Sequence, residues 1–140
     1  MNRGEAGHRI LPHTADLLIE AWGPSRARCF EEAVRALVST FVDVVEVPAS
    51  EPVSISIDAG ADNEMLAAVL DEILFLADVS GRVPIHLTLE ESEDGGLAGV
   101  LDVIAIDGLD VVGPLPKGAS YGGEVAESGG LWHCRVVVDI

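Results

Sequence analysis

The stretch PHTADLLIEAWG, residues 12–23, joins a short polar segment to an alternating apolar run. Alternation of this kind predicts a half-buried strand, and we expect an extended chain from Arg9 to Gly23. Asp16 stands directly before the run, and an acid in such a place is typical of a turn or a cap. The rest of the sequence must decide whether Asp16 only ends a turn or also holds a ligand.

A helix is predicted after the Gly-Pro-Ser break that follows this strand. Ser25 can cap its first turn, and apolar residues then recur at intervals of three and four up to about Val42. Glu31, Glu32 and Arg35 fall on the side opposite this apolar stripe, so we expect them to face solvent. The pattern is that of an amphipathic helix with one buried face.

A second strand and a second helix are predicted next. Alternation over residues 53–57 indicates a half-buried strand. Asp62 or Asn63 can then cap an amphipathic helix, because apolar residues recur after them with the helical period. The Gly of Ser80–Gly81 is a typical helix end.

The remainder of the chain is predicted to be β-structure. Alternating segments separated by Gly-rich turns occupy residues 84–90, 98–107, 120–125 and 131–140. Such spacing is typical of antiparallel hairpins. Together with the two helices it predicts an α+β fold, in which two amphipathic helices cover one side of antiparallel β-sheets.

The chain length and hydrophobicity predict one domain. With 140 residues, 49% of them hydrophobic, the chain can form one independent core and leaves no room for two. We expect residues 1–8 to be a flexible tail and residues 9–140 to be the domain. The sequence has no apolar stretch long enough to span a membrane and no signal peptide, so we expect a cytoplasmic protein without membrane attachment.

The charge balance is strongly acidic. Twenty-four Asp and Glu face only 8 Lys and Arg, which gives a formal net charge of −16. This charge repels phosphate backbones, so direct nucleic-acid binding is not expected. A basic protein partner or bound divalent cations fit the composition better.

Enzyme signatures are absent from the sequence. The segment GPLPKGASYGG lacks the spacing of a phosphate-binding P-loop, and neither a nucleophile elbow nor an HExxH zinc pair occurs. Cys29 and Cys134 are far apart in sequence and are interpreted as small buried hydrophobic residues. The strongest enzymatic alternative is a small acid/base catalyst that uses His13 and Asp16, but no nucleophile or oxyanion signature accompanies them.

A second acid stands at the other end of the sequence. Asp139 closes an otherwise apolar final strand, and a strand-end acid of this kind is usually exposed. If Ile140 is the native terminus, its free carboxylate adds another oxygen group beside Asp139. Hard oxygen donors suit calcium or magnesium and not zinc.

A lysine marks the third candidate position. Lys117 precedes the Gly-Ala-Ser-Tyr segment that ends at Tyr121. It is either a solvated loop lysine or a contact to an anionic group or a protein partner.

Five blocks of sequence resemble the archease family. They are HTADLLIEAWG (13–23), CFEEAVRALVSTFVD (29–43), VLDEILFLADV (69–79), KGASYGGEV (117–125) and WHCRVVVDI (132–140). Each block is weakly specific alone, but together and in this order they cover most of the chain.

The resemblance implies a function that composition does not reveal. Archeases are non-enzymatic cofactors of the GTP-dependent RNA-splicing ligase, whose guanylylation and multiple turnover they promote in tRNA splicing and RNA repair. The family's metal site, filled by calcium in known members, draws on the acids that match Asp16 and Asp139, beside the terminal carboxylate of Ile140. Its functional lysine matches Lys117, and we expect Lys117, Tyr121 and His13 to contact the partner or phosphate.

The chain departs from the family pattern after Lys117. Gly122 stands where the family usually has His, and Ser120 replaces Thr. The main alternative to an archease-like activator is a metal-free protein-interaction or chaperone-like module, in which Asp16 and Asp139 only stabilise strand ends.

Overall fold

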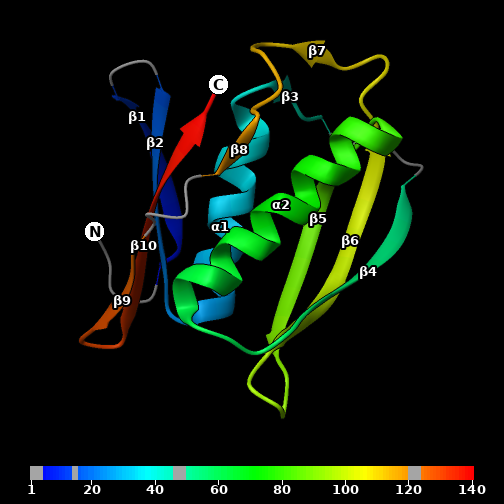
Figure 1. The fold of residues 1–140 in the computed structure, drawn as a ribbon. Coiled ribbons are helices and arrows are strands. Elements are labelled where there is room, and N and C mark those ends of the chain that lie inside the picture. Colours follow the sequence, from blue (N-terminus) through cyan, green and yellow to red (C-terminus); the bar gives the residue numbers. More distant parts are fainter. Residues whose placement is uncertain (1–4, 14–15, 46–49, 120–123) are drawn as a thin grey trace.

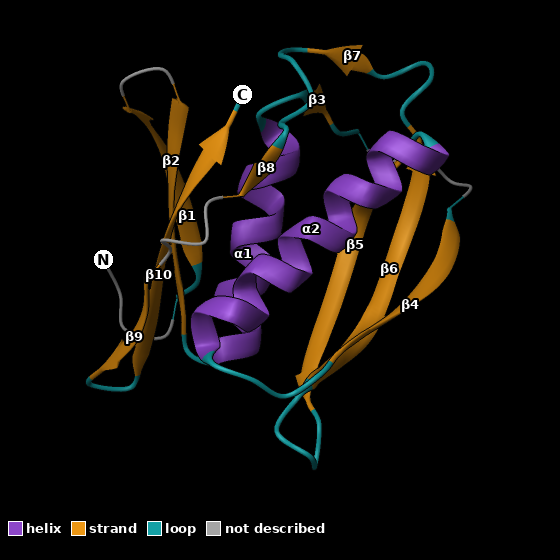
Figure 2. Cartoon of the chain, in the orientation of Figure 1, coloured by secondary structure: helices purple, strands orange, loops and turns teal. Residues whose placement is uncertain are grey.

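Two helices form a central layer between two antiparallel sheets (Figure 1). The fold is known from a computed structural model, which describes residues 5–13, 16–45, 50–119 and 124–140. The predicted α+β class is confirmed. The helices cover one face of each sheet, because a sheet packs on each side of the helical layer (Figure 2).

The first sheet contains both ends of the described chain. Its strand order is β1-β2-β10-β8, and β9 also pairs with β10. The bounds are β1 Gly7–His13, β2 Asp16–Gly23, β8 Gly118–Ala119, β9 Glu124–Ser128 and β10 Leu131–Asp139. The prediction of one extended segment from Arg9 to Gly23 was wrong, because β1 and β2 are antiparallel neighbours in which His13 pairs with Asp16.

The second sheet has three strands in the order β4-β6-β5. Their bounds are β4 Glu51–Ile57, β5 Arg82–Glu91 and β6 Leu97–Ala105. A separate two-stranded sheet pairs β3, Val42–Asp43, with β7, Asp110–Val111. Val42 therefore belongs to a strand and not to the end of the preceding helix.

Helix α1, Arg26–Ser39, is buried on two sides because a sheet packs against each of them. The Ser25 hydroxyl accepts a hydrogen bond from the Arg28 N–H, which confirms the predicted cap. Glu31 and Glu32 are only 5% and 8% exposed, so the prediction that they face solvent was wrong. The apolar stripe was correctly placed, but the opposite face meets protein as well.

Helix α2, Asp62–Ser80, begins differently from the prediction and ends as predicted. Its N-cap is Ala61, which makes no side-chain cap. Asp62 is already helical, and its carboxylate binds Arg26 of α1 over 2.8 Å, so tertiary pairing takes the place of capping. The helix ends at Gly81, whose φ of 62° lies in the left-handed region that glycine adopts without strain.

The first strand begins two residues before the expected domain boundary at Arg9. Gly7 pairs with Trp22, and a Cβ at Gly7 would lie 2.8 Å from the Trp22 ring, so the indole packs directly over the glycine. Residues 1–4 of the expected tail lie outside the described residues. In the described part of the chain, no helix is long and apolar enough to cross a membrane.

Candidate functional site

The β2–β10 register sets the two predicted acids across from each other. The pairing runs from Trp132↔Gly23 to Val138↔Leu17, and one further step in the same register places Asp139 opposite Asp16. Side chains opposite each other on antiparallel strands have Cβ atoms about 4.5–5.5 Å apart. Two carboxylates from opposite ends of the sequence therefore meet at one end of the first sheet.

Strand alternation directs both carboxylates to the outer face of this sheet. Val138 is fully buried and Leu17 packs against the core, so both face the helices. Because successive side chains of a strand point to opposite faces, Asp16 and Asp139 point away from the core. Asp139 is exposed and Asp16 is half-buried, which leaves the pair open to a hydrated ion.

The backbone of Lys117 is fixed to the same end of the sheet. Its N–H donates to the Asp139 carbonyl over 2.7 Å, and Gly118 of β8 pairs with Asp139. The Lys117 side chain is exposed. The described arginines each pair with an acidic side chain: Arg9, Arg26, Arg28, Arg35, Arg82 and Arg135.

Ile140 and His13 also lie at this end, whereas Tyr121 cannot be placed. The half-buried Ile140 side chain packs against the core, which holds the residue after Asp139 in position. His13 is the backbone partner of Asp16 across the β1–β2 hairpin. Tyr121, with Ser120 and Gly122, lies outside the described residues.

The donor chemistry of this end fits a hard divalent cation. It offers the carboxylates of Asp16 and Asp139, and the terminal carboxylate where Ile140 ends the native chain. These are oxygen donors of the kind that calcium and magnesium prefer. Nowhere in the described residues do three or more His, Cys, Asp or Glu side chains gather as a metal cluster.

Sequence reasoning missed a polar bridge that runs through α1. Glu31 Oε2 accepts the backbone N–H of Leu89 in β5 over 2.8 Å, and Glu32 Oε1 lies 2.9 Å from His8 Nδ1 in β1. The spacing of Arg28 and Arg35 around Glu32 was the available signal, since residues three and four apart on a helix are neighbours. Both arginines do pair with Glu32.

The electrostatics of Glu32 follow from this bridge. Burial alone raises the pKa of its carboxyl, but the hydrogen bond from His8 and the charge of Arg35 outweigh burial, so the net pKa is lowered.

The two cysteines are buried small side chains, as predicted, because Cys29 and Cys134 are both buried and free. Their mutual hydrogen bond, followed by burial, raises the pKa of the Cys29 thiol, which keeps it unreactive.

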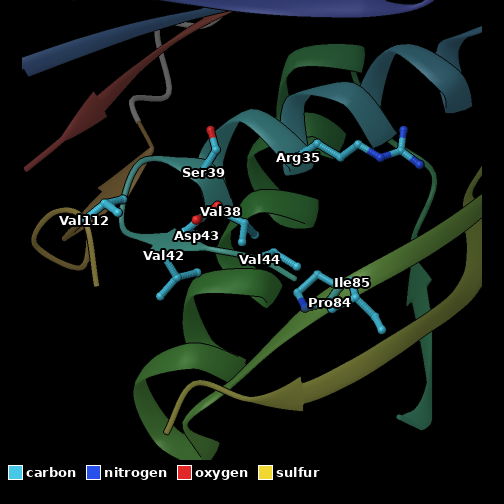
Figure 3. Close-up of a pocket in the computed structure, with 9 residues that line it drawn as sticks. All are labelled: Arg35, Val38, Ser39, Val42, Asp43, Val44, Pro84, Ile85 and Val112. Carbon is cyan, nitrogen blue, oxygen red and sulfur yellow. The ribbon is translucent and has the colours of Figure 1, made fainter. Parts of the chain in front are cut away.

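A separate groove lies between the end of α1, β3 and β5 (Figure 3). Its volume is about 420 Å³, and its lining is mainly apolar: Arg35, Val38, Ser39, Val42, Asp43, Val44, Pro84, Ile85 and Val112. The groove shares no residue with the Asp16–Asp139 end of the sheet. Arg35 is already paired with Glu32, which leaves Ser39 and Asp43 as the other polar side chains of a mainly apolar lining.

Comparison with known proteins identifies the family. Residues 8–140 match the model of the Archease protein family (MTH1598/TM1083). The chain belongs to the archease family. A "Probable protein archease" from Mycobacterium tuberculosis is 37% identical to it over 137 residues, which cover 96% of this chain and 75% of the relative. A "Protein archease" from Pyrobaculum neutrophilum is 26% identical over 141 residues, which cover 96% of each chain.

Two solved structures share the archease fold of this chain. The solution structure of Methanobacterium thermoautotrophicum protein 1598 has a TM-score of 0.70 at 23% identity and covers 96% of this chain and 99% of its own. The crystal structure of the Thermotoga maritima archease, described as a possible chaperone, has a TM-score of 0.65 at 18% identity and covers 94% and 96%. At these identities the likeness establishes the fold alone.

Proposed function

We propose that this archease-family chain is a non-enzymatic activator of a GTP-dependent RNA-splicing ligase in the cytoplasm. It would promote guanylylation and multiple turnover of the ligase during tRNA splicing or RNA repair. A divalent cation, calcium or magnesium, would be held by Asp16, Asp139 and, where it is the native terminus, the carboxylate of Ile140. The observation that supports the proposal is the β2–β10 register, which runs to Val138↔Leu17 and would set Asp139 opposite Asp16 one step further on.

The chain's own residues give this proposal its physical basis. Two carboxylates held across from each other repel, and a divalent cation relieves that repulsion. When bound, the cation supplies positive charge that can organise phosphate oxygens. Lys117, fixed by its backbone to Asp139, adds a positive charge at the same end of the sheet. The net charge of −16 favours a ligase with a basic RNA-binding face over direct RNA binding.

Reconstitution with the ligase of the same organism tests the function. We would mix ligase, GTP and RNA ends with the wild-type chain and follow ligase guanylylation and the number of turnovers. Asp16→Asn and Asp139→Asn should lose most of the stimulation, while the exposed loop variant Asp58→Asn should keep it. A ligase whose guanylylation rate is the same with and without the wild-type chain would contradict the proposal.

A metal-free interaction module is the second candidate. It is favoured by the finding that only two acidic side chains meet at the site in the described part of the chain, and by the description of the Thermotoga maritima relative as a possible chaperone. The same reconstitution separates the two candidates. Stimulation that survives both EDTA and Asp16→Asn would assign the function to the metal-free module.

A further inference from the structure

Helix α2 exposes an aromatic side chain that the fold does not need. Five of the eleven residues in the block VLDEILFLADV, residues 69–79, are buried, but Phe75 and Val79 are each 63% exposed. They lie one turn apart on the same face of the helix. Large apolar side chains gathered on a surface mark interaction sites more often than isolated ones do.

A groove runs beside Phe75. Its volume is about 480 Å³, and we name it the α2 groove after its lining residues, which are Asp71, Leu74, Phe75 and Asp78 of α2 and Leu115, Pro116 and Lys117 of the facing segment. Leu115 is also exposed, so apolar groups are present on both walls. The groove ends at Lys117, whose backbone N–H donates to the Asp139 carbonyl.

We propose that the α2 groove docks a basic segment of the ligase partner. An apolar side chain of that segment would pack on Phe75 and Leu115, and a Lys or Arg would face Asp78. The proposal rests on the proposed function. The α2 groove would be the surface that holds the ligase while Asp16 and Asp139 act at the ligase active site.

The acidic character of the groove favours a basic segment as its occupant. Two acids, Asp71 and Asp78, line the groove against one lysine, Lys117, and the whole chain carries a net charge of −16. A second copy of the chain would bring the same acids to the groove, and like charges placed opposite each other oppose docking. A basic segment meets attraction at the rim and buries an aromatic side chain at the centre, which is the usual arrangement of a binding hot spot.

Binding measurements with matched variants test the proposal. The affinity of the full chain for the ligase would be measured by calorimetry for wild type, Phe75→Ala and Asp78→Lys. Val100→Thr and Glu93→Lys are the controls, because both residues are exposed and lie outside the groove. Circular dichroism checks that each variant is folded, and Ala and Lys are both good helix formers.

The expected result is a loss of affinity of roughly tenfold or more for Phe75→Ala and for Asp78→Lys, with both controls near wild type. If wild type binds and the two groove variants bind equally well, the docking proposal is overturned and the proposed function stands. If wild type does not bind the ligase at all, both are overturned. Self-association that Phe75→Ala abolishes, measured by analytical ultracentrifugation, would assign the groove to a second copy and would also overturn the docking proposal.

Discussion

The carboxylate of Glu31 in α1 accepts a hydrogen bond from the backbone N–H of Leu89 in β5 over 2.8 Å. Strand β5 is an edge strand of the second sheet, so its outward N–H groups have no strand partner. Glu31 satisfies one of them, and the next residue, Glu32, binds His8 of β1 in the first sheet. Two consecutive acids thus attach one helix to both sheets.

Removal of the Glu31 carboxylate should destabilise the fold. Glu31→Ala leaves the buried Leu89 N–H without an acceptor and Arg28 without one of its partners. We expect the free energy of unfolding to fall by about 1–3 kcal/mol, measured by urea denaturation. Glu31→Gln keeps an acceptor and should cost less, and Glu72→Ala on the exposed face of α2 is the control. Equal losses in Glu31→Ala and Glu72→Ala would contradict the bridge.

The pH dependence of stability should carry the signature of Glu32. Its pKa is lowered in the folded chain, because the hydrogen bond from His8 and the charge of Arg35 outweigh the effect of burial. A lowered carboxyl pKa gives stability that is present above the unfolded value of about 4.3 and is lost as pH falls through the folded value. Urea unfolding from pH 6 to pH 3 should therefore show a steeper loss in wild type than in Glu32→Gln. Parallel curves for the two proteins would rule out this origin.

The Asp16–Asp139 pair should bind calcium or magnesium only in the folded chain. A ligand that binds the native state at about 100 times its Kd adds about 2.7 kcal/mol to stability, which raises Tm by several degrees. We expect this shift with at least one of the two cations in wild type, its reversal by EDTA, and its absence in the Asp16→Ala/Asp139→Ala double variant. A melting temperature that no cation changes would remove the metal from the proposed function.

The terminal carboxylate has its own test. Appending Gly-Ser after Ile140 moves the free carboxylate away from Asp139 while it keeps both acidic side chains. We expect cation affinity to fall roughly tenfold, equivalent to about 1.4 kcal/mol, because one oxygen group leaves the site. Calorimetric titration of the extended and original chains gives the comparison. Identical affinities would restrict the protein ligands to the two side chains.

Lys117 should matter for activation and not for stability. Its side chain is exposed, so Lys117→Ala should leave Tm within about 1 °C of wild type, as is usual for surface substitutions. Ligase guanylylation should nevertheless be stimulated less, and Lys117→Arg should restore part of the effect. A variant that melts early and activates normally would reverse the interpretation.

Local sequence patterns predicted where helices and strands lie better than they predicted which strands pair with each other. Alternation located the strand that holds Leu17 and Ile19, and Ser25 correctly marked the start of α1. The reversal between His13 and Asp16 was missed because the intervening residues do not form an Asn-Gly or Asp-Gly turn signal. A turn is predicted from the residue types at the turn itself, and the residue types between β1 and β2 give only a weak turn signal.

Burial from two sides is what the helix pattern could not reveal. The stripe containing Phe30 and Leu37 was evident, but Glu31 and Glu32 are buried by sheets formed from distant parts of the chain. The placing of Asp139 opposite Asp16 likewise depends on extending the β2–β10 register by one step, and that register pairs segments more than 100 residues apart. Family resemblance, and not periodicity, indicated that pairing beforehand.

The position of β10 in the sheet also determines when the first sheet can be completed during synthesis. This strand lies between β2 on one side and β8 and β9 on the other, although it comes from the last ten residues of the sequence. On the ribosome, β1 and β2 emerge long before their neighbour exists, and loop closure over nearly the whole chain must precede the final sheet. Residues 16 and 139 can therefore reach the same end of this sheet only after β10 has been synthesised and has paired with β2.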